Sequence, residues 1–122
     1  MKFVITIFSL TIALWATNLD KNLIKQATQS HKMILIEATS DYCGYCTKMK
    51  KEVLSDKDVK EAISKKYIFK EVLVSSQKLP FKLDSEFGGM TPTFFILDEN
   101  GKLIKQIPGS WGKKDFLDFL AK

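Results

Sequence analysis

The sequence predicts an α/β domain in which helices cover both faces of a mixed central sheet. Helical and strand patterns alternate over residues 18–122 in the order α-β-α-α-β-α-β-β-α. The first two strands are joined through helices, which favours parallel pairing, and the last two are joined by the turn at residues 98–101, which favours a hairpin. At 122 residues the chain is long enough to bury one core.

The first half of the chain predicts three helices and one strand. Apolar residues at helical spacing predict a helix over 18–29, and the short apolar run at 33–38 predicts a buried strand. Residues 43–54 predict a second helix with one apolar face. Ser55, with Asp58 three residues later, forms a capping pattern, so a third helix is expected to begin there and to run through about residue 65.

The second half predicts a strand, a short helix, a hairpin and a closing helix. Alternating apolar residues predict a strand over 67–74, and residues 82–87 predict a short helix that a pair of glycines then ends. The β-branched and aromatic run at 93–97 predicts a strand, and its antiparallel partner is expected over 102–107. Apolar residues at helical spacing predict the last helix over 113–122.

The charge pattern argues against a nucleic-acid partner. All 19 basic residues are lysine, and the net charge is +5 in a chain that is 45% hydrophobic and 27% charged. Without arginine the chain lacks the side chain best suited to bidentate contacts with phosphates and bases. Because the lysines are scattered among acidic residues, we expect a solvated charged surface.

The first residues predict a secretory signal peptide over 1–16, which leaves a mature domain over 17–122. Lys2 is followed by an uncharged apolar run that is too short for the roughly 20 residues of a membrane-spanning helix. Cleavage is expected after Ala16, although Leu14 departs from the small-residue rule of such sites, and an uncleaved anchor is the alternative. Export to the periplasm would place the cysteines where disulfides form and persist.

The only two cysteines lie in Cys43-Gly44-Tyr45-Cys46, at the start of a predicted helix. A disulfide that closes so small a ring constrains the unfolded chain little, which favours a redox role over a structural one. Cys43 is the expected nucleophile, because a helix N-terminus stabilises a thiolate, and Cys46 is the expected resolving thiol. Gly44 and Tyr45, which lie between the cysteines, are expected to tune the reduction potential of the pair. Tetrahedral zinc takes four ligands, and His31 is the only histidine, so no metal site is predicted.

The chain resembles the thioredoxin superfamily over about residues 19–122. A strand leads into Cys-x-x-Cys at the start of a helix, and Thr91-Pro92 then precedes a hairpin and a last helix. The resemblance implies a thioredoxin fold of three layers, α/β/α, and thiol–disulfide exchange without a bound cofactor. It also places Thr91 and Pro92 in the family's cis-proline loop, where the backbone of Thr91 would bind an extended substrate segment.

Glu37 lies six residues before the first cysteine and matches the buried acid of this family. The resemblance implies that burial raises the pKa of Glu37 and that its carboxyl group exchanges a proton with Cys46. The alternative is a carboxylate that is satisfied by a lysine, with Lys70 as the nearest candidate.

The active-site motif resembles that of the DsbC/DsbG-type disulfide isomerases, while residues 53–59 are similar to small exported thioredoxin-like proteins and to the thioredoxin-like domain of DsbD-type reductases. This resemblance implies a periplasmic, monomeric protein-disulfide oxidoreductase that reduces or isomerises the disulfides of other proteins. A membrane redox partner of the DsbD/CcdA type would keep it reduced. The alternatives are an oxidant that donates its disulfide and a non-catalytic binding module.

Overall fold

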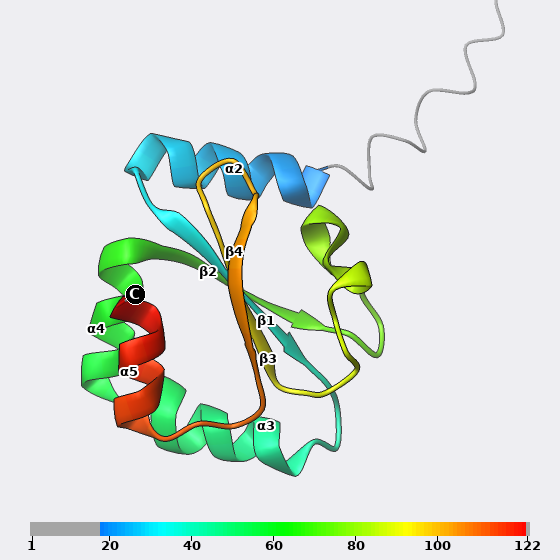
Figure 1. The fold of residues 1–122 in the computed structure, drawn as a ribbon, viewed down its shortest axis with the longest axis vertical. Helices are drawn as coiled ribbons and strands as arrows, with labels where there is room; N and C mark the ends of the chain where they lie inside the picture. The colour runs from blue at the N-terminus through cyan, green and yellow to red at the C-terminus, as the bar shows by residue number, and fades with distance from the viewer. Residues whose placement is uncertain (1–17, 122) are drawn as a thin grey trace, which may run out of the picture.

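A computed structural model describes residues 18–121, in which a four-stranded sheet lies between two layers of helices (Figure 1). In chain order the elements are α2 (Asn18–Ser30), β1 (Met33–Thr39), α3 (Gly44–Met49), the π-helix η1 (Lys50–Leu54), α4 (Lys57–Lys66), β2 (Tyr67–Leu73), the 3-10 helix η2 (Pro80–Ser85), β3 (Thr93–Leu97), β4 (Leu103–Pro108) and α5 (Lys113–Ala121). The predicted signal peptide over residues 1–16 lies outside the described residues.

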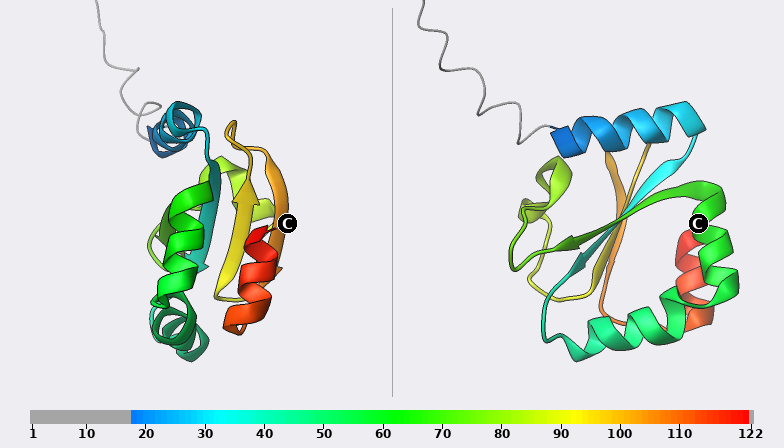
Figure 2. Two further views of the ribbon diagram at one scale, coloured as in Figure 1. Left: turned by 90° about the vertical axis from the view of Figure 1, so that its left-hand side faces the viewer. Right: turned by 180° about the vertical axis from the view of Figure 1, so that it is seen from behind.

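The sheet is mixed, as predicted, with the strand order β2-β1-β3-β4. The strand β1 pairs in parallel with β2 and antiparallel with β3, and β3 forms an antiparallel hairpin with β4. In Figure 2 the left view shows the strands side by side, and the right view shows helical segments on either side of the sheet. The strand that leads into the cysteines is therefore held on both edges, which fixes the position of its carboxyl end.

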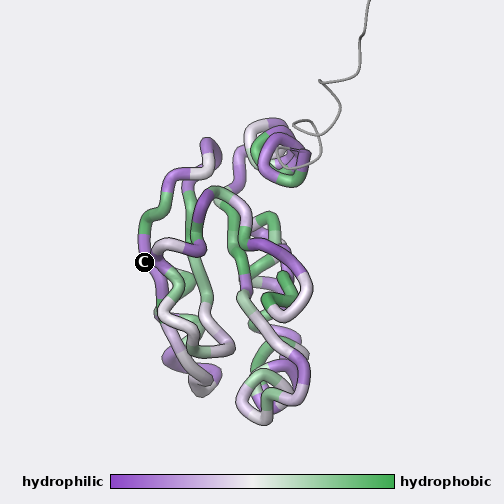
Figure 3. Tube along the Cα trace, turned by 90° about the vertical axis from the view of Figure 1, so that its right-hand side faces the viewer, coloured by the Kyte–Doolittle hydropathy of each residue, from purple (hydrophilic) through white to green (hydrophobic). Residues whose placement is uncertain are grey.

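Alternate residues of β1 face different helix layers. Ile34, Ile36 and Ala38 belong to the core beneath α2 and η2, while Leu35 belongs to the core beneath α3, η1, α4 and α5. Because side chains alternate along a strand, Glu37 shares the face of Leu35 and points toward the helix that begins at the cysteines. In Figure 3 green and purple alternate around the helices, as expected for helices that bury one face.

The predicted start of the third helix at Ser55 is wrong. The residue that caps α4 is Asp56, whose carboxylate accepts hydrogen bonds from the N–H groups of Asp58 (2.9 Å) and Val59 (3.3 Å). Ser55 instead ends the preceding π-helix, and its N–H donates to the carbonyl of Lys50 over 3.1 Å. The helix predicted over 43–54 is thus α3 followed by one π-helical segment.

The short helix predicted over residues 82–87 begins and ends two residues earlier, as the 3-10 helix Pro80–Ser85. It is kinked, because Phe81 and Lys82 have positive φ angles of 56° and 57°. The carboxylate of Asp20 on α2 accepts the N–H of Phe81 at 3.2 Å, which ties this segment to the first helix. A contact with a distant helix therefore holds the start of this segment.

Candidate functional site

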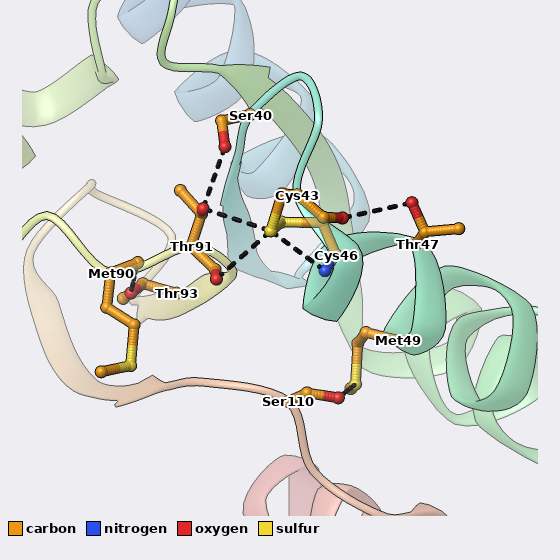
Figure 4. The surroundings of a disulfide bond; sticks show 9 residues. All are labelled: Ser40, Cys43, Cys46, Thr47, Met49, Met90, Thr91, Thr93 and Ser110. Atoms are coloured by element: carbon orange, nitrogen blue, oxygen red, sulfur yellow. Dashed lines mark hydrogen bonds between the residues drawn. A yellow bond between two sulfur atoms is a disulfide. The ribbon is translucent and has the colours of Figure 1, made fainter.

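The two cysteines lie at the start of α3 and are joined in a disulfide (Figure 4). Cys43 is the N-terminal capping residue of α3, and its Sγ accepts a hydrogen bond from the N–H of Cys46 over 3.2 Å. Cys43 is half-buried, whereas Cys46 is 6% exposed. The sulfur that a partner can reach is therefore the one that the helix N-terminus stabilises as a thiolate.

The Thr91–Pro92 peptide bond is cis, as predicted, and its loop brings Thr91 against Cys43 (Figure 4). The hydroxyl oxygen of Thr91 lies 3.3 Å from Cys43 Sγ, and its carbonyl oxygen lies 3.4 Å from the same sulfur. The Ser40 hydroxyl lies 3.0 Å from the Thr91 hydroxyl. The N–H of Gly109 donates to the carbonyl of Pro92 over 2.7 Å, which ties the loop to the end of β4.

Large apolar side chains are exposed on the segments that meet at the disulfide. Tyr42 and Tyr45 flank the first cysteine and are 107% and 70% exposed, and Met90 precedes the cis-proline loop and is 57% exposed. Met90 and the partly exposed Trp111 both approach the Cα of Gly109, within 4 Å of where a Cβ would lie. Such a concentration of exposed apolar groups is typical of a surface that binds other proteins.

Glu37 is a buried acid, as its position in β1 predicted, with 2% of its surface exposed. Burial, together with the negative charge of Glu71 and against the positive charge of Lys50, raises the pKa of Glu37 from 4.5 to about 7. Glu71 is the register partner of Glu37 on the parallel strand β2. Lys70 pairs with Ile36 in the same register and so belongs to the opposite face of the sheet, which rules it out as the partner of Glu37.

A polar hollow of about 180 Å³ opens beside the second cysteine. Cys46, Thr39 and Thr47 line it together with the exposed side chains of Lys50 and Glu71. The hollow gives water and protons access to the buried half of the cysteine pair. A larger hollow of about 460 Å³ lies between α4 and α5 and contains neither cysteine.

Sequence reasoning missed Ser40, Lys50 and Glu71. Ser40 carried a local signal, because it is a hydroxyl residue three positions before Cys43, where the predicted strand ends. Lys50 and Glu71 carried none, because their approach to Glu37 depends on the π-helix and on the strand register.

Within residues 18–121, no group of three or more cysteine, histidine or acidic side chains lies close enough to hold a metal ion. His31 is exposed in the turn between α2 and β1, at the end of β1 that is remote from the cysteines. The fold therefore does not bring the histidine and the two thiols together.

Known structures share this fold, although no curated protein is similar enough in sequence to count as a relative. A thioredoxin from Thermus thermophilus is 23% identical, with a TM-score of 0.72 over 83% of this chain and 80% of that chain. A disulphide isomerase from Xylella fastidiosa is 16% identical, with a TM-score of 0.69 over 98% of this chain and 97% of that one. The reduced C-terminal domain of DsbD from Neisseria meningitidis is 18% identical, with a TM-score of 0.66 over 86% and 94%. At these identities the likeness establishes the fold.

Family membership rests on the sequence as well. The profile of a family described as a thioredoxin-like domain matches residues 20–122. In the part of the chain that the structure describes, no helix is both long and apolar enough to cross a membrane. The mixed sheet, the Cys-x-x-Cys pair at the start of α3 and the profile match agree, and the chain belongs to the thioredoxin-like family.

Proposed function

We propose that this protein is a periplasmic thiol:disulfide oxidoreductase that reduces or isomerises disulfide bonds in other proteins. The observation that carries the proposal is the placement of the Cys43–Cys46 disulfide. The accessible sulfur of Cys43 lies at a helix N-terminus and 3.3 Å from the hydroxyl of Thr91, in the loop that would hold a substrate. A structural disulfide needs neither an accessible sulfur nor a neighbouring binding loop.

The reaction starts from the reduced pair. The Cys43 thiolate attacks one sulfur of a substrate disulfide, a mixed disulfide forms, and the other substrate sulfur leaves as a thiolate that takes up a proton. Cys46 then loses its proton, and its thiolate attacks Cys43 Sγ and releases the second substrate thiolate. The substrate gains two electrons and two protons, while the pair becomes a disulfide. In isomerisation a thiolate of the substrate itself displaces Cys43, so the pair stays reduced.

Glu37 is the proposed proton acceptor for Cys46. Its carboxyl group lies on the sheet face covered by α3, the helix that holds Cys46, and its pKa of about 7 lets it exchange a proton near neutral pH. Cys46 needs such a group because it is buried and its thiol must ionise before it attacks. The hollow beside Cys46 is also lined by Lys50 and Glu71, the two charged residues that shift the pKa of Glu37.

The proposed substrate is an extended segment of another protein. The backbone of Thr91 lies beside Cys43 and is available to pair with such a segment as an added strand. The exposed side chains of Tyr42, Tyr45 and Met90 supply apolar contacts on either side of the sulfur. A small thiol such as glutathione has too little surface to use these contacts, so proteins are the favoured partners.

The location and the electron source are part of the proposal. The predicted signal peptide over residues 1–16 supports a periplasmic location. Each reduction consumes the dithiol, so the protein needs a source of electrons, and we assign this role to a membrane protein of the DsbD/CcdA type. We propose that the protein works as a monomer.

The test is reduction of insulin disulfides by the full chain, alongside the Cys43→Ser and Cys46→Ser variants and the double variant that carries both substitutions. The wild type should accelerate insulin reduction, Cys43→Ser should be inactive, and Cys46→Ser should accumulate a mixed disulfide because the resolving thiol is gone. Acceleration that survives in the variant lacking both thiols would contradict the proposal. Equilibration with glutathione tests the direction: about −270 mV fits a reductant, and a potential near about −120 mV would identify an oxidant instead.

A further inference from the structure

Two hydroxyl groups form a chain that ends on the nucleophilic sulfur. Ser40 Oγ lies 3.0 Å from Thr91 Oγ1, and Thr91 Oγ1 lies 3.3 Å from Cys43 Sγ. Figure 4 shows Ser40 and Thr91 on one side of this sulfur and the N–H of Cys46 on the other. Ser40 comes from the end of β1 and Thr91 from a loop 51 residues further on, so tertiary structure alone brings them together.

The direction of this chain of hydrogen bonds depends on which group receives the hydrogen of the Thr91 hydroxyl. A hydroxyl group has one hydrogen to donate and two lone pairs that accept. If Thr91 donates its hydrogen to Cys43 Sγ, then the hydrogen in the 3.0 Å contact must come from Ser40. Within the described residues Thr91 Oγ1 is the only partner of the Ser40 hydroxyl, so no other protein group competes for that hydrogen.

We propose that Ser40 is a positioning residue, whose hydroxyl donates to Thr91 Oγ1 and thereby directs the hydrogen of Thr91 to the Cys43 sulfur. The Thr91 hydroxyl then stabilises the thiolate that begins the exchange, beside the N–H of Cys46 at 3.2 Å. Donation by Ser40 also polarises the Thr91 hydroxyl and strengthens its own donation. The proposal rests on the proposed function only in naming Cys43 as the nucleophile.

The carbonyl group of Thr91 has the opposite effect on the same sulfur. Its oxygen lies 3.4 Å from Cys43 Sγ, where it can accept the hydrogen of a neutral thiol after reduction. The carbonyl therefore favours the thiol and the hydroxyl favours the thiolate. Only the hydroxyl depends on Ser40, so loss of Ser40 shifts the balance toward the neutral thiol.

The charges around Cys43 do not depend on Ser40. The two loops at residues 88–93 and 108–112 contain no titratable side chain. The titratable groups on the other surrounding elements are Asp41, Tyr42, Tyr45, Cys46, Lys48, Lys50, Glu37 and Glu71. None of them shares a hydrogen bond with Ser40, so replacement of Ser40 by alanine leaves these charges in place.

The test measures the rate at which iodoacetamide alkylates the reduced full chain as a function of pH, with the modified cysteine identified by mass spectrometry. Ser40→Ala should raise the pKa of Cys43 by about 0.5 to 1 unit, which lowers the thiolate fraction below the pKa about three- to tenfold. Thr91→Val keeps the side-chain shape and should raise the pKa at least as much. Ser40→Ala should add nothing in the Thr91→Val background, and Ser40→Thr should restore the wild-type profile.

Ser110→Ala is the matched control, because this hydroxyl belongs to the same site but contacts the sulfur of Met49 at 3.9 Å. An unchanged profile in Ser40→Ala would overturn the proposal, as would an equal shift in the presence and absence of the Thr91 hydroxyl. A shift in Ser110→Ala as large as that in Ser40→Ala would also overturn it. Alkylation needs no partner protein, so a failure to reduce insulin with the Ser40 effect intact would count against the proposed function alone.

Discussion

Replacing Glu37 by glutamine should stabilise the folded protein at alkaline pH and leave its stability unchanged in acid. The side chain is 2% exposed, and burial is the main reason that its pKa rises from 4.5 to about 7. Glutamine has the shape of the protonated acid and carries no charge at any pH. The variant therefore removes the cost of burying an ionised carboxylate and keeps the packing.

The magnitude follows from the two pKa values. Between pH 4.5 and about 7 the folded state binds more protons at Glu37 than the unfolded state, so the free energy of unfolding falls as pH rises through this window. Above the window the ionised carboxylate of Glu37 lowers the free energy of unfolding by the full amount, which is about 3 kcal/mol. Below about pH 4.5 the carboxyl group is protonated in both states and the difference vanishes.

The assay is urea denaturation of the oxidised wild type and Glu37→Gln at about pH 4 and about pH 8.5, and the quantity of interest is the difference between the two proteins at each pH. Glu52→Gln makes the same chemical change at an exposed site on η1 and should alter stability little at either pH. A Glu37→Gln effect of the same size at both pH values would refute the reasoning, because the burial of an ionised carboxylate would then not be what costs stability.

Two further substitutions test the charge beside Glu37 and the turn of the β3–β4 hairpin. Glu71→Gln removes the negative charge that faces Glu37, so the pKa of Glu37 should fall and the pH window over which stability declines should move to lower pH in the same denaturation assay. Gly101→Ala should destabilise the hairpin turn by about 1–3 kcal/mol, because its φ is +85° and a Cβ would lie 2.6 Å from the ring of Phe81. Gly112→Ala meets no atom within 4 Å and is the matched control, and equal losses in the two variants would contradict the argument.

Elements with strong local patterns were predictable. The strand predicted over residues 93–97 is the observed β3, and the first helix extends one residue beyond its predicted end. Local sequence does not fix where the helix predicted at Ser55 begins, since Ser55 and Asp56 are both good capping residues. The π-helix decides between them, because it uses the N–H of Ser55 in its own last turn.

The candidate site was predictable where its chemistry is local. The spacing of Cys43 and Cys46 is a property of four consecutive residues, and it indicated a redox pair at a helix start. The contact between Ser40 and Thr91, by contrast, spans 51 residues, and no local pattern carries it. Glu37 faces Glu71 because of the register of two parallel strands, and these strands are far apart in the sequence, so no local pattern carries the pairing.

The surroundings of the two sulfurs explain why the exchange has a fixed order. Cys43 faces the N–H of Cys46 and the hydroxyl of Thr91, which both favour its thiolate, whereas burial disfavours the thiolate of Cys46. In the proposed mechanism, attack on a substrate therefore starts at Cys43, and release of the substrate depends on a proton acceptor for Cys46. It follows that Glu37→Gln should leave the alkylation of Cys43 nearly unchanged and should slow the resolution of the mixed disulfide. The stability gained by removing the buried charge and the activity lost with it would then have one cause.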